Sequence, residues 1–419
     1  MKVSELVRKL PFDFYNIVTR NKLVNLLETR KKNETSHFVK LYVQEKENNI
    51  KNHAYYTTFF YSKHPEFPVI SKKDIQSNID GFISNKFKKK DLDKITTSGS
   101  YGTPSVFYKN SEKKKNQIAD VLYYGGKNGY FFGIKHAFIR GVEKPKKSLF
   151  IQNEIHLSPN KLGKKAMEEY YLKLKKVSYI VGFPSVLLRF IEFCKEYKLK
   201  PLKNIEGILC TAEPLTLGER KVISDFFECD VITRYASEEV GIIANRLPEE
   251  DFYRINENSV KLEIYKMDED VPQEAGEEGR IIVTDFFSHA MPLINYDTGD
   301  LGVVDYIEED NDKVKILKEI TGRLVEQIYD ENDEGVSPFA INVYLKEFDR
   351  LGQFQFVQES KSRYTLLLTN KLDNEYKDRI ENGLKSILGE NTNIFFEHID
   401  EIPSLSSGKR PYIRNDYKK

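Results

Sequence analysis

A segment rich in glycine and small hydroxyl side chains, residues 96–104, is the first part of the sequence suited to chemistry. It reads Thr-Thr-Ser-Gly-Ser-Tyr-Gly-Thr-Pro. Glycines let the backbone curl so that successive N–H groups converge on an anion, and small hydroxyls add donors without bulk. The same composition is typical of surface turns. Taken alone, the segment leaves a phosphate-binding loop and a turn as alternatives.

Several familiar ligand motifs do not occur in the sequence. The glycine-rich residues 125–129 lack the hydroxyl residue that completes a Walker loop. There is no Gly-x-Gly-x-x-Gly pattern and no pair of histidines at metal-ligand spacing. The sequence therefore supports neither a Rossmann dinucleotide site nor a zinc hydrolase.

Five short motifs follow the loop in a fixed order. They are Cys210-Thr211-Ala212-Glu213-Pro214, Tyr235-Ala236-Ser237-Glu238-Glu239-Val240-Gly241, Tyr296-Asp297-Thr298-Gly299-Asp300, Thr321-Gly322-Arg323 and Ser406-Ser407-Gly408-Lys409. The series resembles the adenylate-forming superfamily of acyl-CoA synthetases, firefly-type luciferases and peptide-synthetase adenylation domains. The residues of these motifs are most similar to those of the phenylacetate-CoA ligase and CapK-like branch. The resemblance runs from about residue 94 to 410, and the residues before about 90 carry no assignable motif.

The resemblance implies an ATP site. Residues 98–104 would form a mobile loop over the β- and γ-phosphates, and Tyr235 would stack on the base. The loop residues that would contact phosphate are Ser98, Gly99, Ser100, Gly102 and Thr103. The residues that would line the adenine edge are Ala212, Glu213 and Pro214.

The resemblance also assigns the charged side chains. Glu239 would hold Mg²⁺ between the phosphates, as a hard oxygen ligand for a hard cation. Asp300 would accept both ribose hydroxyls through its two carboxylate oxygens. Arg323 would reach the ribose, and Lys409 would meet the substrate carboxylate and the α-phosphate, where charge builds up in the reaction.

The implied reaction joins a carboxylic acid to the α-phosphorus of ATP and releases pyrophosphate. Because Lys409 would lie on a small domain and the other groups on a large one, closure about a hinge near residue 325 would complete the site. Rotation there would then admit an acceptor. That acceptor is coenzyme A, a carrier-protein thiol or another small nucleophile.

Several positions depart from the family pattern. Ala236 replaces a glycine, and Glu238 replaces a hydroxyl residue before the glutamate, where it either repels triphosphate or joins the metal shell. Thr103 stands where lysine is common, and Val325 stands at the hinge. The Val325 departure bears on thiol transfer more than on adenylation, because transfer needs the rotated conformation. Amide or ester formation on a sugar or amine and a non-catalytic nucleotide-binding scaffold remain as alternatives.

The acid pocket is the least defined part of the predicted site. Phe183 and Pro184 stand where relatives carry a turn that walls this pocket, although a packed core turn explains them equally well. The aromatic residues 123–126 and 130–133 are candidates for the other wall, because acid pockets are mostly apolar. Aromatic runs of this kind more often belong to the hydrophobic core of a protein.

The elements that must position these residues alternate between strands and helices. The pattern predicts strands at 177–181, 205–210 and 230–233 and helices at 185–197 and 217–227. This alternation implies an α/β fold with parallel pairing, in which ligands collect at the carboxyl ends of strands.

The pattern of predicted elements changes after about residue 260. Short strand-like runs predict a β-rich subdomain at about residues 255–322 within a large N-terminal domain, residues 1–322. Strands at 354–358, 364–368 and 394–398 and a helix at 374–388 then predict a small mobile α+β C-terminal domain, residues 323–419.

The bulk composition limits the partners. A net charge of +1 over 419 residues gives no field that would draw in nucleic acid. Three cysteines without CxxC spacing are expected to be buried thiols in a reducing compartment, so the expected location is cytoplasmic. The sequence shows no signal peptide and no membrane span of about 20 apolar residues.

Overall fold

The structure is a computed structural model that describes most of the 419 residues. The described residues are 22–33, 36–96, 105–141, 143–159, 163–309, 311–323, 328–336, 341, 344–345, 347–348, 350–403 and 411–417. Their contacts divide the chain into two compact units. The first consists of Met1–Thr298 and Val303–Glu319, and the second of Gly299–Gly302 and Ile320–Lys419.

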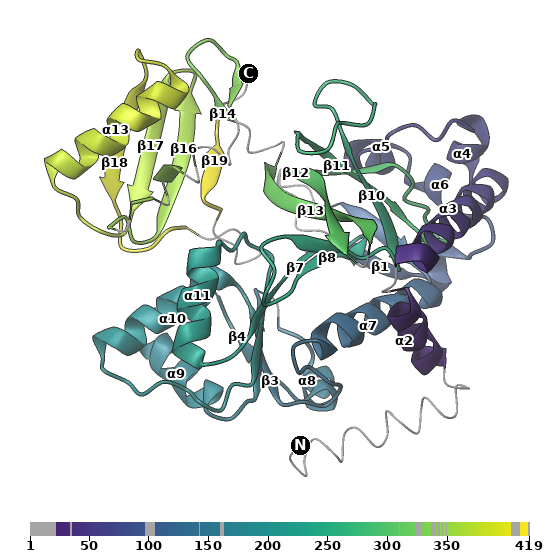
Figure 1. Ribbon diagram of the computed structural model, residues 1–419, viewed down its shortest axis with the longest axis horizontal. Coiled ribbons are helices and arrows are strands. Elements are labelled where there is room, and N and C mark those ends of the chain that lie inside the picture. Colours follow the sequence, from purple (N-terminus) through teal and green to yellow (C-terminus); the bar gives the residue numbers. More distant parts are fainter. Residues whose placement is uncertain are drawn as a thin grey trace. The chain divides into compact units, whose positions relative to one another are not determined.

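An eleven-stranded sheet organises the first unit (Figure 1). Its strand order is β10-β11-β12-β13-β9-β8-β7-β6-β5-β3-β4. The strands are β3 (His136–Ile139), β4 (Glu154–Leu157), β5 (Tyr179–Gly182), β6 (Gly207–Thr211), β7 (Val231–Ser237), β8 (Gly241–Arg246), β9 (Tyr253–Ile255), β10 (Val260–Tyr265), β11 (Glu278–Asp285), β12 (Tyr296–Glu309) and β13 (Asp312–Arg323). The block from β4 to β7 is parallel, which confirms the predicted α/β class.

Helices cover the parallel block on one side, where α9, α10 and α11 lie together (Figure 1). They are α9 (Lys164–Leu174), α10 (Pro184–Glu196) and α11 (Leu217–Phe227). Apolar residues at helical spacing in α10 pack into the main core, and a capping box of Thr216 and Glu219 starts α11. The core fixes where the parallel strands end, and hence where the motif residues that follow them lie.

The predicted β-rich subdomain does not form a separate sheet. Its strands β10 to β13 are all present, but β13 pairs with β9 and β9 pairs with β8, so they continue the sheet of the parallel block. The pairing turns antiparallel at β7–β8. A period-2 pattern predicts a strand but not its neighbour, and so the join could not be seen in the sequence.

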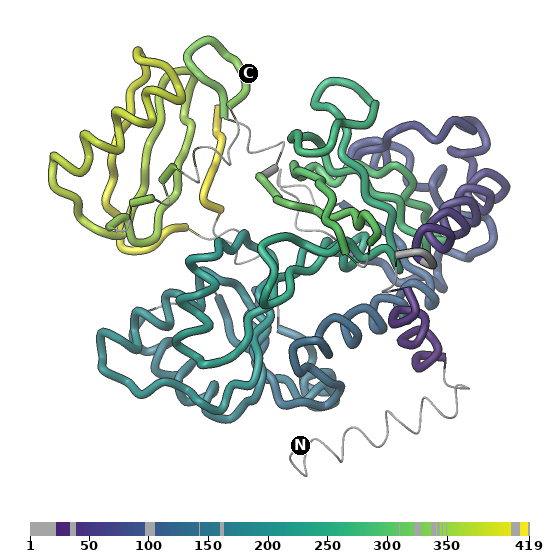
Figure 2. The backbone as a smooth tube through the Cα atoms, viewed as in Figure 1, coloured from purple at the N-terminus to yellow at the C-terminus, as the bar shows by residue number. Residues whose placement is uncertain are grey.

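The N-terminal helices pack on this unit, with α3 beside β10 (Figure 2). They are α2 (Lys22–Lys32), α3 (Ser36–Thr57), α4 (Phe59–Lys63), α5 (Lys72–Ser77) and α6 (Ile79–Phe82), followed by the short 3₁₀ helix η1 (Lys89–Asp91). The buried Arg30 of α2 pairs with Asp120 at 2.8 Å. Asp120 belongs to α7 (Ser111–Gly126), and α8 (Lys146–Gln152) lies between β3 and β4 in the chain. No helix in the described part of the chain is long and apolar enough to span a bilayer.

The second unit has a core of its own. Its four-stranded sheet has the order β18-β17-β16-β19 and carries one long helix, α13, seen in the yellow-green part of Figure 2. The elements are β14 (Ile328–Tyr329), β15 (Gly335–Val336), β16 (Phe354–Ser360), β17 (Arg363–Leu368), α13 (Asn374–Leu388), β18 (Asn393–His398) and β19 (Ile413–Asn415). This is the α+β arrangement that the sequence predicts for the C-terminal part of the chain.

Candidate functional site

The predicted phosphate loop joins the two strands of a short hairpin. Strands β1 (Asp93–Thr96) and β2 (Val106–Lys109) pair antiparallel, with Thr96 opposite Val106. The loop residues Ser98, Gly99, Ser100, Gly102 and Thr103 lie outside the described residues, as do Lys409 and the hinge residue Val325. For Arg323 the structure describes the backbone, at the end of β13. Their proposed roles therefore stay predictions.

The Ala212–Pro214 motif follows the carboxyl end of β6, where ligands of parallel sheets collect. Ala212 has a φ of 72°, which is rare for a residue with a side chain and is typical of strained functional turns. The Glu213 carboxylate accepts a hydrogen bond from the Ser185 N–H at 3.1 Å, at the start of α10. The turn is thus held in one shape beside a helix N-terminus.

Tyr235 lies near the carboxyl end of β7, one strand further along the sheet. Its hydroxyl donates to Thr298 Oγ1 at 3.4 Å, and Thr298 in turn donates to the Ile281 carbonyl at 2.9 Å. Two predicted motifs, which lie more than 60 residues apart in the sequence, are therefore adjacent in the first unit.

Glu239 carries a buried carboxylate in this region. The residue is 2% exposed and lies in the turn between β7 and β8. Its Oε1 accepts a hydrogen bond from the Tyr296 hydroxyl at 2.8 Å and pairs with the Lys72 ammonium at 3.0 Å. Burial alone raises the pKa of such a carboxyl, but Lys72 and the hydrogen bonds outweigh it and hold the pKa of Glu239 below its ordinary value. Glu239 therefore stays ionised despite its burial.

Lys72 is a member of the site that sequence reasoning missed, because no motif precedes residue 90. Two hydrogen bonds tie the backbone of Ile70 to Asn295 and Asp297, at 3.1 and 2.8 Å, beside the first residues of β12. Ser71 then starts α5 through a capping box with Asp74, so Lys72 is the first helical residue. The only signal in the sequence was this Ser-x-x-Asp start.

Two more lysines lie behind the Glu239 turn. Lys113 of α7 pairs with Asp285 and donates to the Glu239 carbonyl, and Gln117 of α7 donates to the Val240 carbonyl at 3.2 Å. Lys109 donates to Gln117 Oε1 at 3.1 Å. Burial, reinforced by the charge of Lys113, lowers the pKa of Lys109 to about 8. Helix α7 thus fixes the turn from behind.

The residues of this turn suit a metal that bridges phosphates. Mg²⁺ in such sites takes one or two carboxylates and fills its shell with phosphate oxygens and water, which an ionised, buried Glu239 permits. Glu238 is exposed whereas its neighbour is buried. Among the described residues no group of three or more His, Cys, Asp or Glu is placed to hold a metal by itself. The arrangement fits a metal that arrives with ATP.

Asp300 lies in β12, four residues after Tyr296. Gly299, just before it, has a φ of 74°, a conformation that glycine adopts without strain. Contacts group residues 299–302 with the second unit. The role of Asp300 on ribose stays a prediction.

Of the predicted acid-pocket residues, Phe183 and Pro184 lie at the start of α10. Phe183 is 5% exposed and belongs to the main core, while Pro184 occupies the first helical position. On the other face of the sheet, Tyr130 and Phe131 pack against a second, smaller core cluster that contains Tyr179. Whether either group lines an acid pocket stays a prediction.

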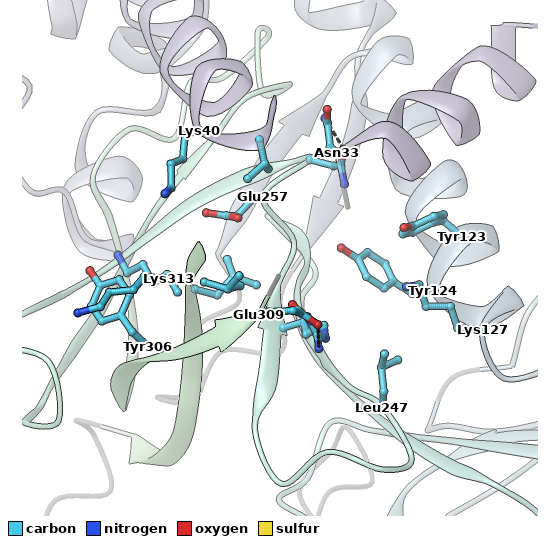
Figure 3. A pocket seen from close by; sticks show the side chains of 16 residues that line it. Asn33, Lys40, Tyr123, Tyr124, Lys127, Leu247, Glu257, Tyr306, Glu309 and Lys313 are labelled. Atoms are coloured by element: carbon cyan, nitrogen blue, oxygen red, sulfur yellow. Dashed lines mark hydrogen bonds and ion pairs between the residues drawn. The ribbon is translucent and has the colours of Figure 1, made fainter. Parts of the chain in front are cut away.

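A cavity of about 490 Å³ lies elsewhere in the first unit (Figure 3). Tyr123, Tyr124 and Lys127 stand on one side of it, and Lys40 and Glu257 on the other. Its lining carries several charges, unlike the mostly apolar wall expected for an acid pocket. None of the predicted ATP-site residues whose side chains the structure describes lines it.

Comparisons with known proteins agree with this arrangement. The CapK C-terminal domain family matches residues 328–416. Protein CapK of Staphylococcus aureus is 27% identical over 374 residues, which covers 84% of this chain and 80% of that protein.

Solved structures resemble the chain in fold. A 2-hydroxyisobutyryl-CoA ligase, solved in the postadenylation state with 2-HIB-AMP, superposes with a TM-score of 0.70 at 13% identity and 88% coverage of both chains. ATP-bound MatB from Rhodopseudomonas palustris superposes with a TM-score of 0.55 at 14% identity, over 78% of this chain and 67% of that one. The chain is therefore similar to Protein CapK and has the fold of adenylate-forming enzymes, and its residues 328–416 match the CapK C-terminal domain family.

Proposed function

We propose that this protein activates a carboxylic acid with ATP, forming an acyl-adenylate and releasing pyrophosphate. One observation carries the proposal: an ionised, buried Glu239 follows directly on the strand that presents Tyr235. The shared fold supports it, since one structural relative was solved with an acyl-AMP. In this reaction a carboxylate oxygen forms a bond to the α-phosphorus. The bond from that phosphorus to the bridging oxygen breaks, and pyrophosphate leaves with its electron pair.

The chain's own residues position the reactants rather than react. Tyr235 stacks on the base, and the strained Ala212–Pro214 turn lines its edge. Asp300 and Arg323 hold the ribose, the loop at residues 98–104 covers the phosphates, and Lys409 neutralises oxygens at the α-phosphate. Holding both reactants in line lowers the entropic part of the barrier, which is the main contribution in phosphoryl-type transfers.

Two groups of charge neutralise the triphosphate in this proposal. Mg²⁺ bound through Glu239 supplies Lewis acidity to the phosphate oxygens. The loop carries Thr103 where relatives often carry a lysine, so it lacks one cation. Lys72 supplies that positive charge in this proposal, because its ammonium lies 3.0 Å from Glu239, beside the proposed phosphate site. The exposed Glu238 adds negative charge nearby, so it makes the lysine more necessary.

The acceptor is a thiol in the leading form of the proposal, with coenzyme A as the first choice. Its support is that structural relatives are CoA ligases, one of them solved with both 2-HIB-AMP and CoA. Transfer to a carrier-protein thiol follows the same chemistry. Domain rotation about a hinge near residue 325 would exchange Lys409 for the acceptor. A second form, which the resemblance to the CapK-like branch implies, is amide or ester formation on a sugar or amine without a thioester.

The cellular location belongs to the same proposal. The three cysteines are all unpaired, and burial raises the pKa of Cys194 to about 11 and of Cys229 to about 12. Unreactive, unpaired thiols suit a reducing compartment, so we place the protein in the cytoplasm.

Pyrophosphate release with a panel of aromatic, fatty and dicarboxylic acids tests the function. Each acid is assayed with and without coenzyme A, and with amines or sugars as other acceptors. Acid-dependent release of pyrophosphate is the expected result. A thioester formed only with coenzyme A identifies an acid–thiol ligase, of the phenylacetate-CoA type if phenylacetate is the preferred acid, and adenylate consumed only by an amine or sugar identifies the second form. ATP binding without release by any acid contradicts the proposal and leaves a nucleotide-binding scaffold.

A further inference from the structure

The cavity of Figure 3 lies within the first unit and is large enough for a small molecule. Its volume is about 490 Å³, and pockets for small ligands span about 300–1,000 Å³. The lining comes from the ends of α2 and α7, the start of α3, strand β9 with the turn after it, and the β12–β13 hairpin. Side-chain hydrogen bonds from Asn33 at 2.9 Å and Tyr42 at 3.1 Å to Asn258 hold α2 and α3 against that turn. The fold therefore builds this space from several elements of one unit.

Glu257 is an acidic group on the wall of the cavity, in the turn between β9 and β10. Asn256 of the same turn accepts a hydrogen bond from the Tyr124 hydroxyl at 3.2 Å, so α7 fixes the turn. No hydrogen bond or ion pair reaches the Glu257 carboxylate from the residues that the structure describes. Burial raises the pKa of Glu257, and the charges of Lys315 and Lys40 oppose this effect without cancelling it. Partly buried acceptors of this kind are normally satisfied, so the carboxylate is available to a ligand.

The other charges of the lining are mostly positive. Glu309, the second carboxylate, is already held by both terminal nitrogens of Arg254, at 2.8 and 3.0 Å. Lys40, Lys313 and Lys315 form no ion pair with any residue that the structure describes. Lys315 donates to a backbone carbonyl of β10 at 2.7 Å and is largely buried, whereas Lys40 and Lys313 are exposed. Ammonium groups that converge on one space without carboxylate partners favour an anion there.

Aromatic rings line the cavity opposite these lysines. Tyr123 and Tyr124 lie toward one side, and Lys40 and Lys313 lie toward the other (Figure 3). The two tyrosine rings are 5.0 Å apart and nearly perpendicular. Tyrosine offers an apolar face to a flat or ring-shaped group and a hydroxyl to its edge. A ligand that fits this space therefore has an anionic end and a ring end.

We propose that this cavity binds a phosphate monoester that carries a ring and neighbouring hydroxyl groups, the chemistry that nucleoside monophosphates and sugar phosphates share. Lys313, Lys315 and Lys40 pair with the phosphate oxygens. Glu257 accepts the hydroxyl groups, and the tyrosines pack against the ring. The ligand is bound unchanged. The proposal goes beyond acid adenylation and does not depend on it.

Direct binding to the full chain tests the proposal. Isothermal titration calorimetry is carried out without ATP or acid, in a buffer free of phosphate. UMP and glucose 1-phosphate represent the two sources, inorganic phosphate is the anion without a ring, and uridine and glucose are the rings without an anion. We expect at least one ester to bind about 100-fold more tightly than inorganic phosphate and than its own dephosphorylated form, since several charge-assisted contacts are lost. The ester that binds more tightly identifies a nucleotide or a sugar phosphate as the source. Absence of binding by both esters, or equal binding of inorganic phosphate, overturns the proposal.

Variants place the bound ester in the cavity. Lys313→Met and Lys315→Met should each weaken binding of the ester about tenfold. Glu257→Leu should bring the affinity for the ester closer to that for inorganic phosphate, because the hydroxyl groups lose their acceptor. Lys318→Met is the matched control, since Lys318 is an exposed lysine of β13 that does not line the cavity. Lys72→Met is the control for the ATP site, and both controls should keep the wild-type affinity.

The outcomes separate this inference from the proposed function. An affinity that is unchanged in folded Lys313→Met and Lys315→Met overturns the inference, and so does an affinity that falls in Lys72→Met alone. Lys313 is exposed, so Lys313→Met decides the matter if Lys315→Met does not fold. Circular dichroism checks the folding of each variant. If no acid releases pyrophosphate, adenylation fails, while ester binding that depends on Lys313 and Lys315 still supports the cavity as a site.

Discussion

Two lysines contact the buried residue Glu239. Lys72 contacts its side chain, and Lys113 contacts its backbone carbonyl. The motif around Glu239 is visible in the sequence because its residues are consecutive. Lys72 is not visible, since it reaches the site only through the backbone pairing of Ile70 with β12. Residues that a fold brings together across more than 160 positions leave no spacing to read.

The first prediction concerns Lys72 and ATP. Lys72→Met should weaken metal-free ATP binding about tenfold, because one charge-assisted contact to phosphate is lost. Isothermal titration calorimetry without divalent metal measures this affinity. Lys73→Met is the matched control, since Lys73 is the exposed next residue and should leave the affinity unchanged. Equal affinities of wild type and Lys72→Met, with both folded, would remove Lys72 from the site.

The second prediction concerns Lys109 and pH. The pKa of Lys109 is lowered to about 8 in the folded protein, against about 10.4 for a free lysine. Between these values the unfolded chain binds more protons, so wild-type stability rises with pH. Relative to Lys109→Met, the free energy of unfolding of the wild type should rise by roughly 2–3 kcal/mol between pH 8 and pH 10.5. Urea unfolding of both proteins across this range measures the gain. A difference in unfolding free energy that does not change with pH would show that the pKa of Lys109 is not lowered in the folded protein.

At the scale of single elements, the local spacing of apolar residues predicted most boundaries of the helices and strands well. The helices predicted at 217–227 and 374–388 match α11 and α13, and the strand predicted at 364–368 lies within β17. Strand β7 extends beyond the predicted run at 230–233, because its end carries motif residues such as Tyr235 instead of apolar ones. The functional ends of strands break the pattern that predicts strands.

The third prediction concerns the junction of helices α2 and α7. Arg30 and Asp120 are both about 2% exposed, and Ser259 also donates to Asp120 at 2.8 Å. Arg30→Met leaves a buried carboxylate without its cation, which should cost about 3–5 kcal/mol. Urea unfolding monitored by circular dichroism measures the loss. Asp120→Asn in addition should recover part of it, and a loss below about 1 kcal/mol in the single variant would contradict this account of the junction.

At the scale of the whole molecule, the sequence predicted a parallel α/β part and a β-rich part. It did not predict which strands of the two parts pair with each other. The parallel block and the later antiparallel strands form one sheet through β8 and β9, which no local pattern contains. Pairing between distant strands depends on packing over long sequence separations. The C-terminal core could be predicted because its helix and strands are consecutive and its apolar residues pack with one another.

The fourth prediction concerns the second unit by itself. Its core of Leu, Ile and aromatic residues is drawn entirely from residues 328–413. A fragment of residues 320–419 should therefore fold alone and unfold in one cooperative transition. Thermal unfolding followed by circular dichroism and by dispersion in an NMR spectrum measures this. A fragment without cooperative unfolding would show that its core depends on the rest of the chain.

The central claim is that a carboxylate oxygen attacks the α-phosphorus of ATP, and isotope transfer tests it directly. The acid from the panel that releases most pyrophosphate is labelled with ¹⁸O in its carboxylate and turned over with ATP and an acceptor. Acyl transfer from an adenylate leaves one carboxylate oxygen on the nucleotide, so the account predicts AMP that carries one ¹⁸O, detected by mass spectrometry. Unlabelled AMP, or ADP as the nucleotide product, would contradict it.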